Sequence, residues 1–427
     1  MRKRLVGHLQ NLAILFLTLS AVFLLIIVIP LELEGENGLK KIERLLYTEQ
    51  APTAQSSDLS TIAAPLNLVL TNDYGRRGEI MTTSLSDTAV QCGSLIREAM
   101  GSATGMSAAS APDFQESLNV QNIFMDFLSA MPAEIIAGLF GADFSESCQA
   151  RCLTLSAAGE DTCTLFLWDG GEQFLRFGTA IPISALQEYL SSVSTNDAKF
   201  AFAAGEEYAG LYPYTILPAG RISVNPLTVS TPSEAVSDKH LLSVLGFNVH
   251  TNYRYPESNG TQVIVEYPRE LRIQPDGTVL YSGDTESTPE LFIASPGADQ
   301  ITASDAALTA LRLAEEIIPP SFSGNAAFFL SHLEENEQGW NISLDVAVDG
   351  MPIYHSSGTS AAEFQFTGST VTSFSIRCRQ YLLSDQTISL LPVTQAAAVA
   401  GNSRNAMLTV AYVDRGGESA SPFWMLR

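Results

Sequence analysis

The spacing of hydrophobic and polar residues divides the chain into an apolar N-terminal segment, a polar connector and a long body of mixed elements. Eighteen consecutive residues from Leu12 to Ile29 carry no charge. At about 1.5 Å per residue, a helix of this length is near the minimum that crosses a hydrocarbon core of about 30 Å. We therefore expect a transmembrane anchor within residues 1–30. A cleaved signal peptide is the competing interpretation, but residues 30–34 lack a small-x-small cleavage site and the apolar stretch exceeds the usual length.

Charges on the two sides of this segment predict its orientation. Arg2, Lys3 and Arg4 precede it, whereas no acidic residue occurs before Glu32. By the positive-inside rule, the N-terminus is cytoplasmic. The predicted localisation is the cell membrane, with a single span and the bulk of the chain extracytoplasmic.

The first part of the body mixes element types. Residues 31–62 are expected to be a juxtamembrane linker, because residues 48–61 offer little to bury. Residues 63–230 predict an α+β domain, in which Asp169-Gly-Gly-Glu172 indicates a hairpin turn because glycine supplies the positive φ of tight turns. The expected elements are strands at 66–70, 163–168, 173–177 and 199–203, helices at 114–131 and 183–190, and a loop at 101–112.

The C-terminal half repeats one plan, a helix followed by a meander of short strands with an Asp-Gly turn. In residues 231–298 the helix covers 237–245, and Gly246 ends it. In residues 299–427 an amphipathic helix covers 304–318, with Ser304 as its candidate N-cap. The expected strands are 263–267, 271–273 and 279–281, then 327–331, 342–348, 353–354, 362–366 and 371–375, and a terminal pair at 407–413 and 422–426 after a helix at 394–400. The predicted fold class is α+β: a transmembrane helix, a mixed α/β domain and two helix-plus-antiparallel-meander units.

Composition and charge exclude several classes of protein. The 427 residues, 46% of them apolar, suffice for two or three domains with their own cores. Acidic residues outnumber basic ones by 46 to 23, and no basic cluster with interleaved aromatic residues relieves the net charge of −23, so nucleic-acid binding is excluded. Five cysteines without a CxxC motif do not form a disulfide scaffold. Whether two of them pair, or most are small buried hydrophobes, stays open.

The sequence offers little material for catalysis. It has no GxSxG, SxxK, HExxH, GxGxxG or P-loop motif. His355 precedes several hydroxyl residues that could form a catalytic cluster with it, although a strand that runs into a polar loop has the same composition. Carboxylates in residues 332–337 suit a calcium ion or, more simply, a solvated hairpin loop. We therefore expect a non-enzymatic protein with no catalytic residue, no cofactor and no metal ligand.

A set of features in the C-terminal half resembles the YycH/YycI family. The features are Leu245-Gly246-Phe247, Glu266-Tyr267, Leu271–Ile273 with Asp276-Gly277 and Tyr281, Val348–Ile353, Phe374, and the terminal strands at Leu408–Tyr412 and Pro422–Trp424. The resemblance covers about residues 235–427 and the N-terminal anchor, and the length is similar to that of YycH. It implies PepSY-like units and a membrane-anchored extracytoplasmic regulator of a cell-wall two-component system of Gram-positive bacteria. The implied partners are a membrane sensor histidine kinase and a YycI-like subunit.

The candidate partner-binding residues lie at the two ends of the chain. Ala13, Thr18, Ser20 and Ala21 are the small and hydroxyl residues through which the span would contact another helix, unless the span is a passive anchor. Phe423 and Trp424 lie on the final strand, where strand addition is expected.

The alternative function is an extracytoplasmic binding module for a cell-wall fragment, a peptide or a cation, with residues 63–230 as the receptor. An aromatic-lined pocket there would favour this alternative, and a shallow polar surface would count against it. The tryptophans suit stacking on sugars or, by their strand periodicity, packing in the core.

Overall fold

The computed structural model describes residues 66–82, 86–233, 235–286, 288–295, 300–400 and 406–426. Strands predominate in these ranges, with eight helices among them, so the fold class is α+β. All of them lie in the compact unit Ser57–Arg427. In the described ranges, no helix has both the length and the apolar character needed to cross a membrane. The predicted span, the linker at 31–62 and the candidates Ala13, Thr18, Ser20 and Ala21 lie outside the described residues.

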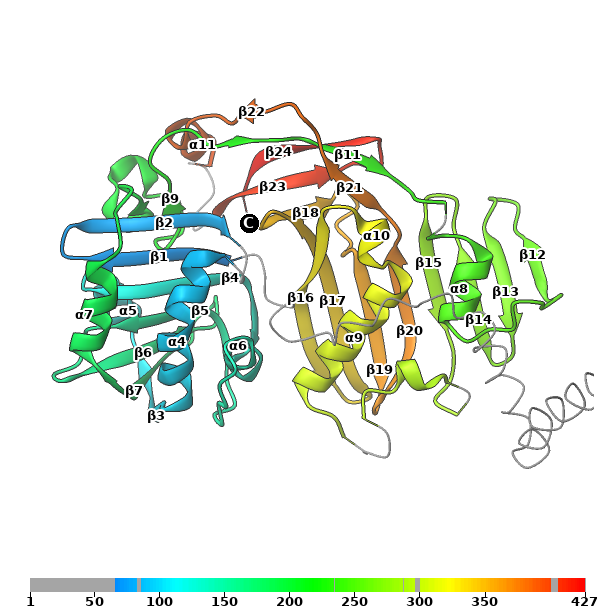
Figure 1. Ribbon diagram of the computed structural model, residues 1–427, viewed down its shortest axis with the longest axis horizontal. Helices are drawn as coiled ribbons and strands as arrows, with labels where there is room; N and C mark the ends of the chain where they lie inside the picture. Colours follow the sequence, from blue (N-terminus) through cyan, green and yellow to red (C-terminus); the bar gives the residue numbers. More distant parts are fainter. Residues whose placement is uncertain are drawn as a thin grey trace, which may run out of the picture. The chain divides into compact units, whose positions relative to one another are not determined.

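The first part of the body is a seven-stranded antiparallel sheet with the strand order β2-β1-β4-β5-β6-β7-β3. Three helices, α4 (Asp87–Gly101), α6 (Ala133–Leu139) and α7 (Ile183–Ser191), cover one face (Figure 1). The short α5 (Ala111–Ser117) and residues 200–216 pack on the other face. The strands are β1 (Leu66–Asn72), β2 (Gly75–Thr82), β3 (Thr104–Ala109), β4 (Asn122–Pro132), β5 (Gln149–Ser156), β6 (Thr162–Trp168) and β7 (Phe174–Pro182), and β8 (Lys199–Phe200) pairs with β9 (Ile216–Leu217).

Several sequence predictions for this part are confirmed and three are wrong. β1, the β6–β7 hairpin and α7 form where expected. The helix predicted at 114–131 is instead α5 followed by β4, because β4 is central and Asn122–Leu128 are buried on both faces, which hides the strand alternation. The loop predicted at 101–112 contains the edge strand β3 and begins α5. Of the strand at 199–203, only β8 is extended, and a 3₁₀ turn follows.

The C-terminal half forms one thirteen-stranded sheet. Its order is β12-β13-β14-β15-β20-β19-β17-β18-β23-β24-β11-β21, with β16 paired to β17 (Figure 1). The strands are β11 (Leu227–Ser230), β12 (Arg254–Pro256), β13 (Gln262–Glu266), β14 (Arg269–Ile273), β15 (Thr278–Ser282), β16 (Ala326–Asn336), β17 (Gly339–Val348), β18 (Met351–His355), β19 (Ala362–Thr367), β20 (Thr370–Arg377), β21 (Gln380–Leu383), β23 (Leu408–Asp414) and β24 (Ser419–Leu426). A separate pair joins β10 (Ser223–Val224) to β22 (Ile388–Ser389).

Both predicted units contain a helix followed by antiparallel strands, but only the first is a meander, because in the second β17 pairs with β16, β18 and β19. The first comprises α8 (Asp238–Val244) and β12–β15, and the second comprises α9 (Ala303–Ile317) and β16–β20. Antiparallel pairing of β15 with β20 joins them edge to edge. Two further helices are α10 (Pro320–Ser323) and α11 (Val393–Ala400). The N-cap of α9 is Thr302 rather than Ser304, because Thr302 and Asp305 form a reciprocal capping box.

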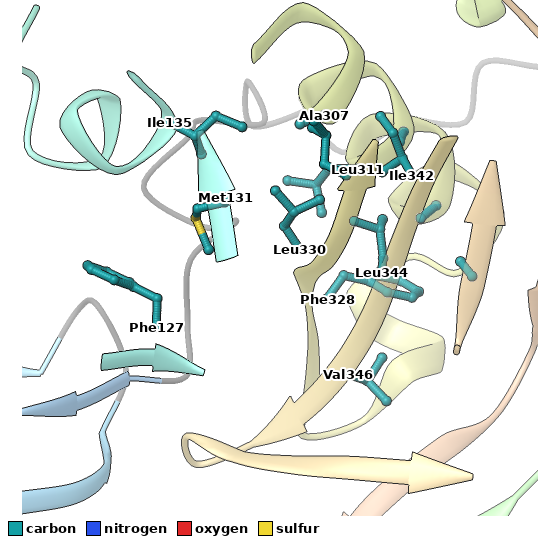
Figure 2. Close-up of a cluster of buried hydrophobic side chains, with 14 of the residues drawn as sticks. Phe127, Met131, Ile135, Ala307, Leu311, Phe328, Leu330, Ile342, Leu344 and Val346 are labelled. Atoms are coloured by element: carbon teal, nitrogen blue, oxygen red, sulfur yellow. The ribbon is translucent and has the colours of Figure 1, made fainter. Parts of the chain in front are cut away.

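Apolar side chains from the two sheets share a buried core. Figure 2 shows Met131 and Ile135, which belong to β4 and α6, beside Ala307, Leu311 and Leu330 from α9 and β16. All of these side chains are at most 1% exposed, so contact between the sheets removes them from water. The five cysteines all lie among the described residues and none is bridged, which resolves the open question in favour of free thiols.

Candidate functional site

His355, the one residue with a candidate catalytic environment in the sequence, lies in a buried polar cluster around Asp414. Parallel pairing of β18 with β23 sets the two residues side by side. Arg379 donates from Nε and Nη2 to the two carboxylate oxygens of Asp414, each at 3.1 Å. The Tyr381 hydroxyl donates to Oδ2 at 2.9 Å, and the Gly416 amide donates to Oδ1 at 2.8 Å. His355 Nδ1 lies 3.8 Å from Asp414 Oδ2, too far for a hydrogen bond.

Burial and charge set the protonation of this cluster. Burial by itself would raise the pKa of Asp414, but the hydrogen bonds from Arg379, Gly416 and Tyr381 outweigh it and hold the pKa below its usual value. Burial, and then the charge of Arg377, lowers the pKa of His355 to about 4 against the opposing pull of Asp414. The imidazole is therefore neutral at pH 7. The Asp414 carboxylate already accepts hydrogen bonds from Arg379, Tyr381 and Gly416, so it joins β21 and the residue before it to the β23–β24 hairpin.

Acidification should destabilise the protein through His355. The unfolded chain takes up the proton near pH 6.5, whereas the folded chain keeps His355 neutral down to about pH 4. Between these two pH values the unfolded state binds more protons than the folded state, so the free energy of unfolding decreases as the pH falls. The decrease amounts to at most about 3 kcal/mol. Above pH 6.5 His355 adds no pH dependence. We expect His355→Phe to flatten this dependence, measured as urea midpoints at pH 7.0, 5.5 and 4.5. The exposed control His250→Gln should retain the wild-type slope, and an equal slope in all three proteins would contradict the assignment.

A hollow of about 810 Å³ opens on the face of the seven-stranded sheet that carries α5. Three segments distant in sequence form it: residues 109–119, the β6–β7 turn, and residues 212–214. Its lining residues are Ala109, Ser110, Ala111, Pro112, Gln115, Glu116, Asn119, Gly171, Glu172, Phe174, Tyr212, Pro213 and Tyr214. The volume is within the range of about 300–1,000 Å³ that small-molecule sites occupy.

Stacked aromatic rings form the floor of this hollow. The Tyr212 ring stacks on Trp168 at 4.9 Å, and Phe174 stacks on the same indole at 5.9 Å. The Tyr214 hydroxyl donates to the carbonyl oxygen of Ala111 at 3.2 Å, which fixes α5 above the floor. The rim carries Glu116 and Glu172, which make no ion pair within the described ranges, and no Lys, Arg or His lines the hollow. The hollow is therefore acidic at its rim and aromatic at its floor.

The two candidate partner-binding residues on the final strand, Phe423 and Trp424, have different environments. β24 pairs with β23 from Ala420 to Leu426 but with β11 only at Ser419 and Ala420. Phe423 is 41% exposed under the guanidinium of Arg415, whereas the Trp424 indole donates to the Leu391 carbonyl oxygen at 2.8 Å. Phe423 is accessible and Trp424 is held against the preceding segment. Their role in partner binding stays a prediction.

The acidic segment at 332–337 is not the hairpin loop that the simpler interpretation predicted: residues 332–336 continue β16 and pair with β17, and Glu337 begins the turn. Its polar composition resembles a loop because residues 334–336 are exposed at the end of the strand. His332 and Glu334 face each other there at 3.6 Å, and both side chains are exposed. Over the described part of the chain, no group of three or more His, Cys, Asp or Glu side chains is placed to hold a metal ion.

Comparisons with known proteins found no matching family model, no matching curated sequence and no matching solved structure.

Proposed function

We propose that this chain is a non-enzymatic, membrane-anchored extracytoplasmic regulator that modulates a membrane sensor histidine kinase of a cell-wall two-component system. The observation that supports the proposal is the joining of two units, each a helix followed by antiparallel strands, through β15 and β20 into one thirteen-stranded sheet. A large, continuous sheet offers a surface for protein contacts, and the net charge of −23 suits basic partner surfaces. The predicted span would confine these contacts to the membrane surface.

Regulation by such a protein requires only unequal binding to two states of the kinase. A partner that binds one signalling state better shifts the equilibrium by the difference in binding free energy. A difference of about 1.4 kcal/mol changes the ratio of states tenfold. Weak contacts from the span and from the extracytoplasmic body are sufficient for this purpose.

Crosslinking and co-purification from the native membrane test the proposal. We expect a histidine kinase, or a YycI-like subunit, to be recovered with the full-length chain. Two variants separate the contacts: one lacks residues 1–30, and the other carries an unrelated apolar span in their place. Recovery only with the native span assigns the contact to the bilayer, and recovery with all three assigns it to the body. Recovery of neither protein with any variant would contradict the proposal.

A second candidate function is an extracytoplasmic binding module, and the aromatic-floored hollow favours it. The hollow lies within residues 63–230, the part for which a receptor role is expected. Its ligand would be a wall fragment, a peptide or a cation, and the acidic rim disfavours anionic ligands.

A further inference from the structure

The two edges of the seven-stranded sheet differ in how they are protected. At the β2 edge, the side chain of Asn196 imitates a neighbouring strand: its Oδ1 accepts from the Gly78 amide and its Nδ2 donates to the Gly78 carbonyl oxygen, both at 2.8 Å. The Asn196 amide also donates to the Arg76 carbonyl oxygen at 2.9 Å. These contacts close the β2 edge to another strand.

The β3 edge has no such cover among the described residues. β3 pairs with β7 on one side, and its residues from Thr104 to Ala108 are exposed. The strand contains no charged residue and no proline, two of the features by which natural edge strands prevent pairing with other chains, and beyond an irregularity between Thr104 and Ser107 its register with β7 is regular from Ser107 to Ala109. An exposed, uncharged edge strand of this length is a template for an added strand.

Both hollows found beside this edge lie on the same face of the sheet. Phe174 of β7 lines the large hollow, while Arg176 and Gly178 line a second one of about 230 Å³ together with Gly105 and Ser107 of β3. Residues 174, 176 and 178 alternate along β7, so they share one face. Four residues of strand span about 13 Å, so a strand of five or six residues on β3 would pass both hollows with alternate side chains directed toward them.

Charge indicates which side chain the large hollow accepts. Glu116 and Glu172 line its rim and make no ion pair in the described ranges, and the floor presents tyrosine and phenylalanine rings. A Lys or Arg side chain satisfies both features, through the carboxylates and through contact of a cation with aromatic rings. We propose that β3 receives an extended segment of a partner protein by strand addition, with a basic side chain of that segment in the large hollow. The inference deepens the proposed function and rests on it for the existence of a protein partner.

Defined peptides test this surface on the full-length protein in detergent. The probes are fluorescein-labelled octapeptides of alternating Thr and Val with one Lys, at position 2 or position 7 to allow for either strand direction. Matched peptides carry Glu in place of Lys, and a third set is N-methylated at alternate amides. Binding is measured by fluorescence anisotropy. We expect a Lys peptide to bind about fivefold more tightly than its Glu counterpart, with the difference shrinking at high salt.

Protein variants separate the contribution of the hollow from that of the edge. The double variant Glu116→Gln, Glu172→Gln should lose the preference for Lys, whereas Glu188→Gln, at an exposed position on α7, should keep it. N-methylation removes donors from the peptide without altering the protein, and it should weaken binding at least tenfold. Equal binding of the Lys and Glu peptides, undiminished binding of the N-methylated peptide, or no binding of any peptide would overturn the proposal. Recovery of a kinase with the double variant as efficiently as with the wild type would leave the regulator function standing and remove this surface from it.

Discussion

Gly350→Ala is expected to lower the free energy of unfolding by about 3 kcal/mol. Asp349 and Gly350 form the two-residue turn between β17 and β18, with φ of +49° and +76°, as a type I′ turn requires. A Cβ at position 350 would lie 2.0 Å from the Met81 carbonyl oxygen and 2.7 Å from that of Thr82. The turn of the large sheet therefore abuts the end of β2 in the seven-stranded sheet, and any side chain must push the two apart.

Gly358→Ala is the matched control for this prediction. Gly358 has the same φ of +76°, but a Cβ there meets no atom within 4 Å. Gly358→Ala should lower the free energy of unfolding only by the cost of placing a side chain at positive φ, about 1 kcal/mol. Urea denaturation followed by tryptophan fluorescence measures both variants, because Trp168 reports on the smaller sheet and Trp340 on the larger one. Equal decreases in the free energy of unfolding for the two variants would show that the close approach of a Cβ at position 350 to the Met81 carbonyl oxygen does not contribute to the cost.

Elements with a regular pattern of buried and exposed residues were predictable from the sequence, whereas the buried central strand β4 was not. α9 shows a clear apolar stripe, and β19 alternates buried and exposed residues, so both follow from local spacing. β4 lies between two strands with helices on one side and α5 on the other, so Ile123, Phe124 and Met125 are all fully buried. The strand period of two disappears in such a run. The sequence predicts a loop where β3 forms, because the small residues of β3 show no periodic spacing of hydrophobic and polar positions.

The candidate sites depend on contacts between residues that are distant in the sequence. His355 was recognisable as an unusual residue, but its neighbour Asp414 comes from a strand 59 positions later, and the two meet only through the parallel pairing of β18 with β23. The large hollow combines three segments between residues 109 and 214, none of which has a motif of its own. The sequence contains one signal for this hollow, a pair of carboxylates and several aromatic residues. This signal identifies a site only after the fold has brought the three segments together.

Arg379→Met is expected to cost about 3–5 kcal/mol at pH 7.5, because it leaves a buried charge without its partner. The Asp414 side chain is only 2% exposed, and Arg379 supplies both of its charged hydrogen bonds. The Arg379 guanidinium also donates to the Gly417 carbonyl oxygen at 2.7 Å, so its loss loosens the β23–β24 turn as well. The measurement is the urea-unfolding free energy of the variant and the wild type.

Two comparisons show whether the cost comes from charge. Arg254→Met removes a cation from the same sheet, but its ion pair with Asp238 is 49% and 41% exposed, so the loss should stay below about 1 kcal/mol. The pH dependence is the second comparison. Without the guanidinium, burial raises the pKa of Asp414, and the carboxylate of the variant takes up a proton on mild acidification while that of the wild type stays ionised. The cost of Arg379→Met should therefore be smaller at pH 5.0 than at pH 7.5. A cost that is the same at both pH values would mean that Arg379 acts through packing rather than by compensating the buried carboxylate.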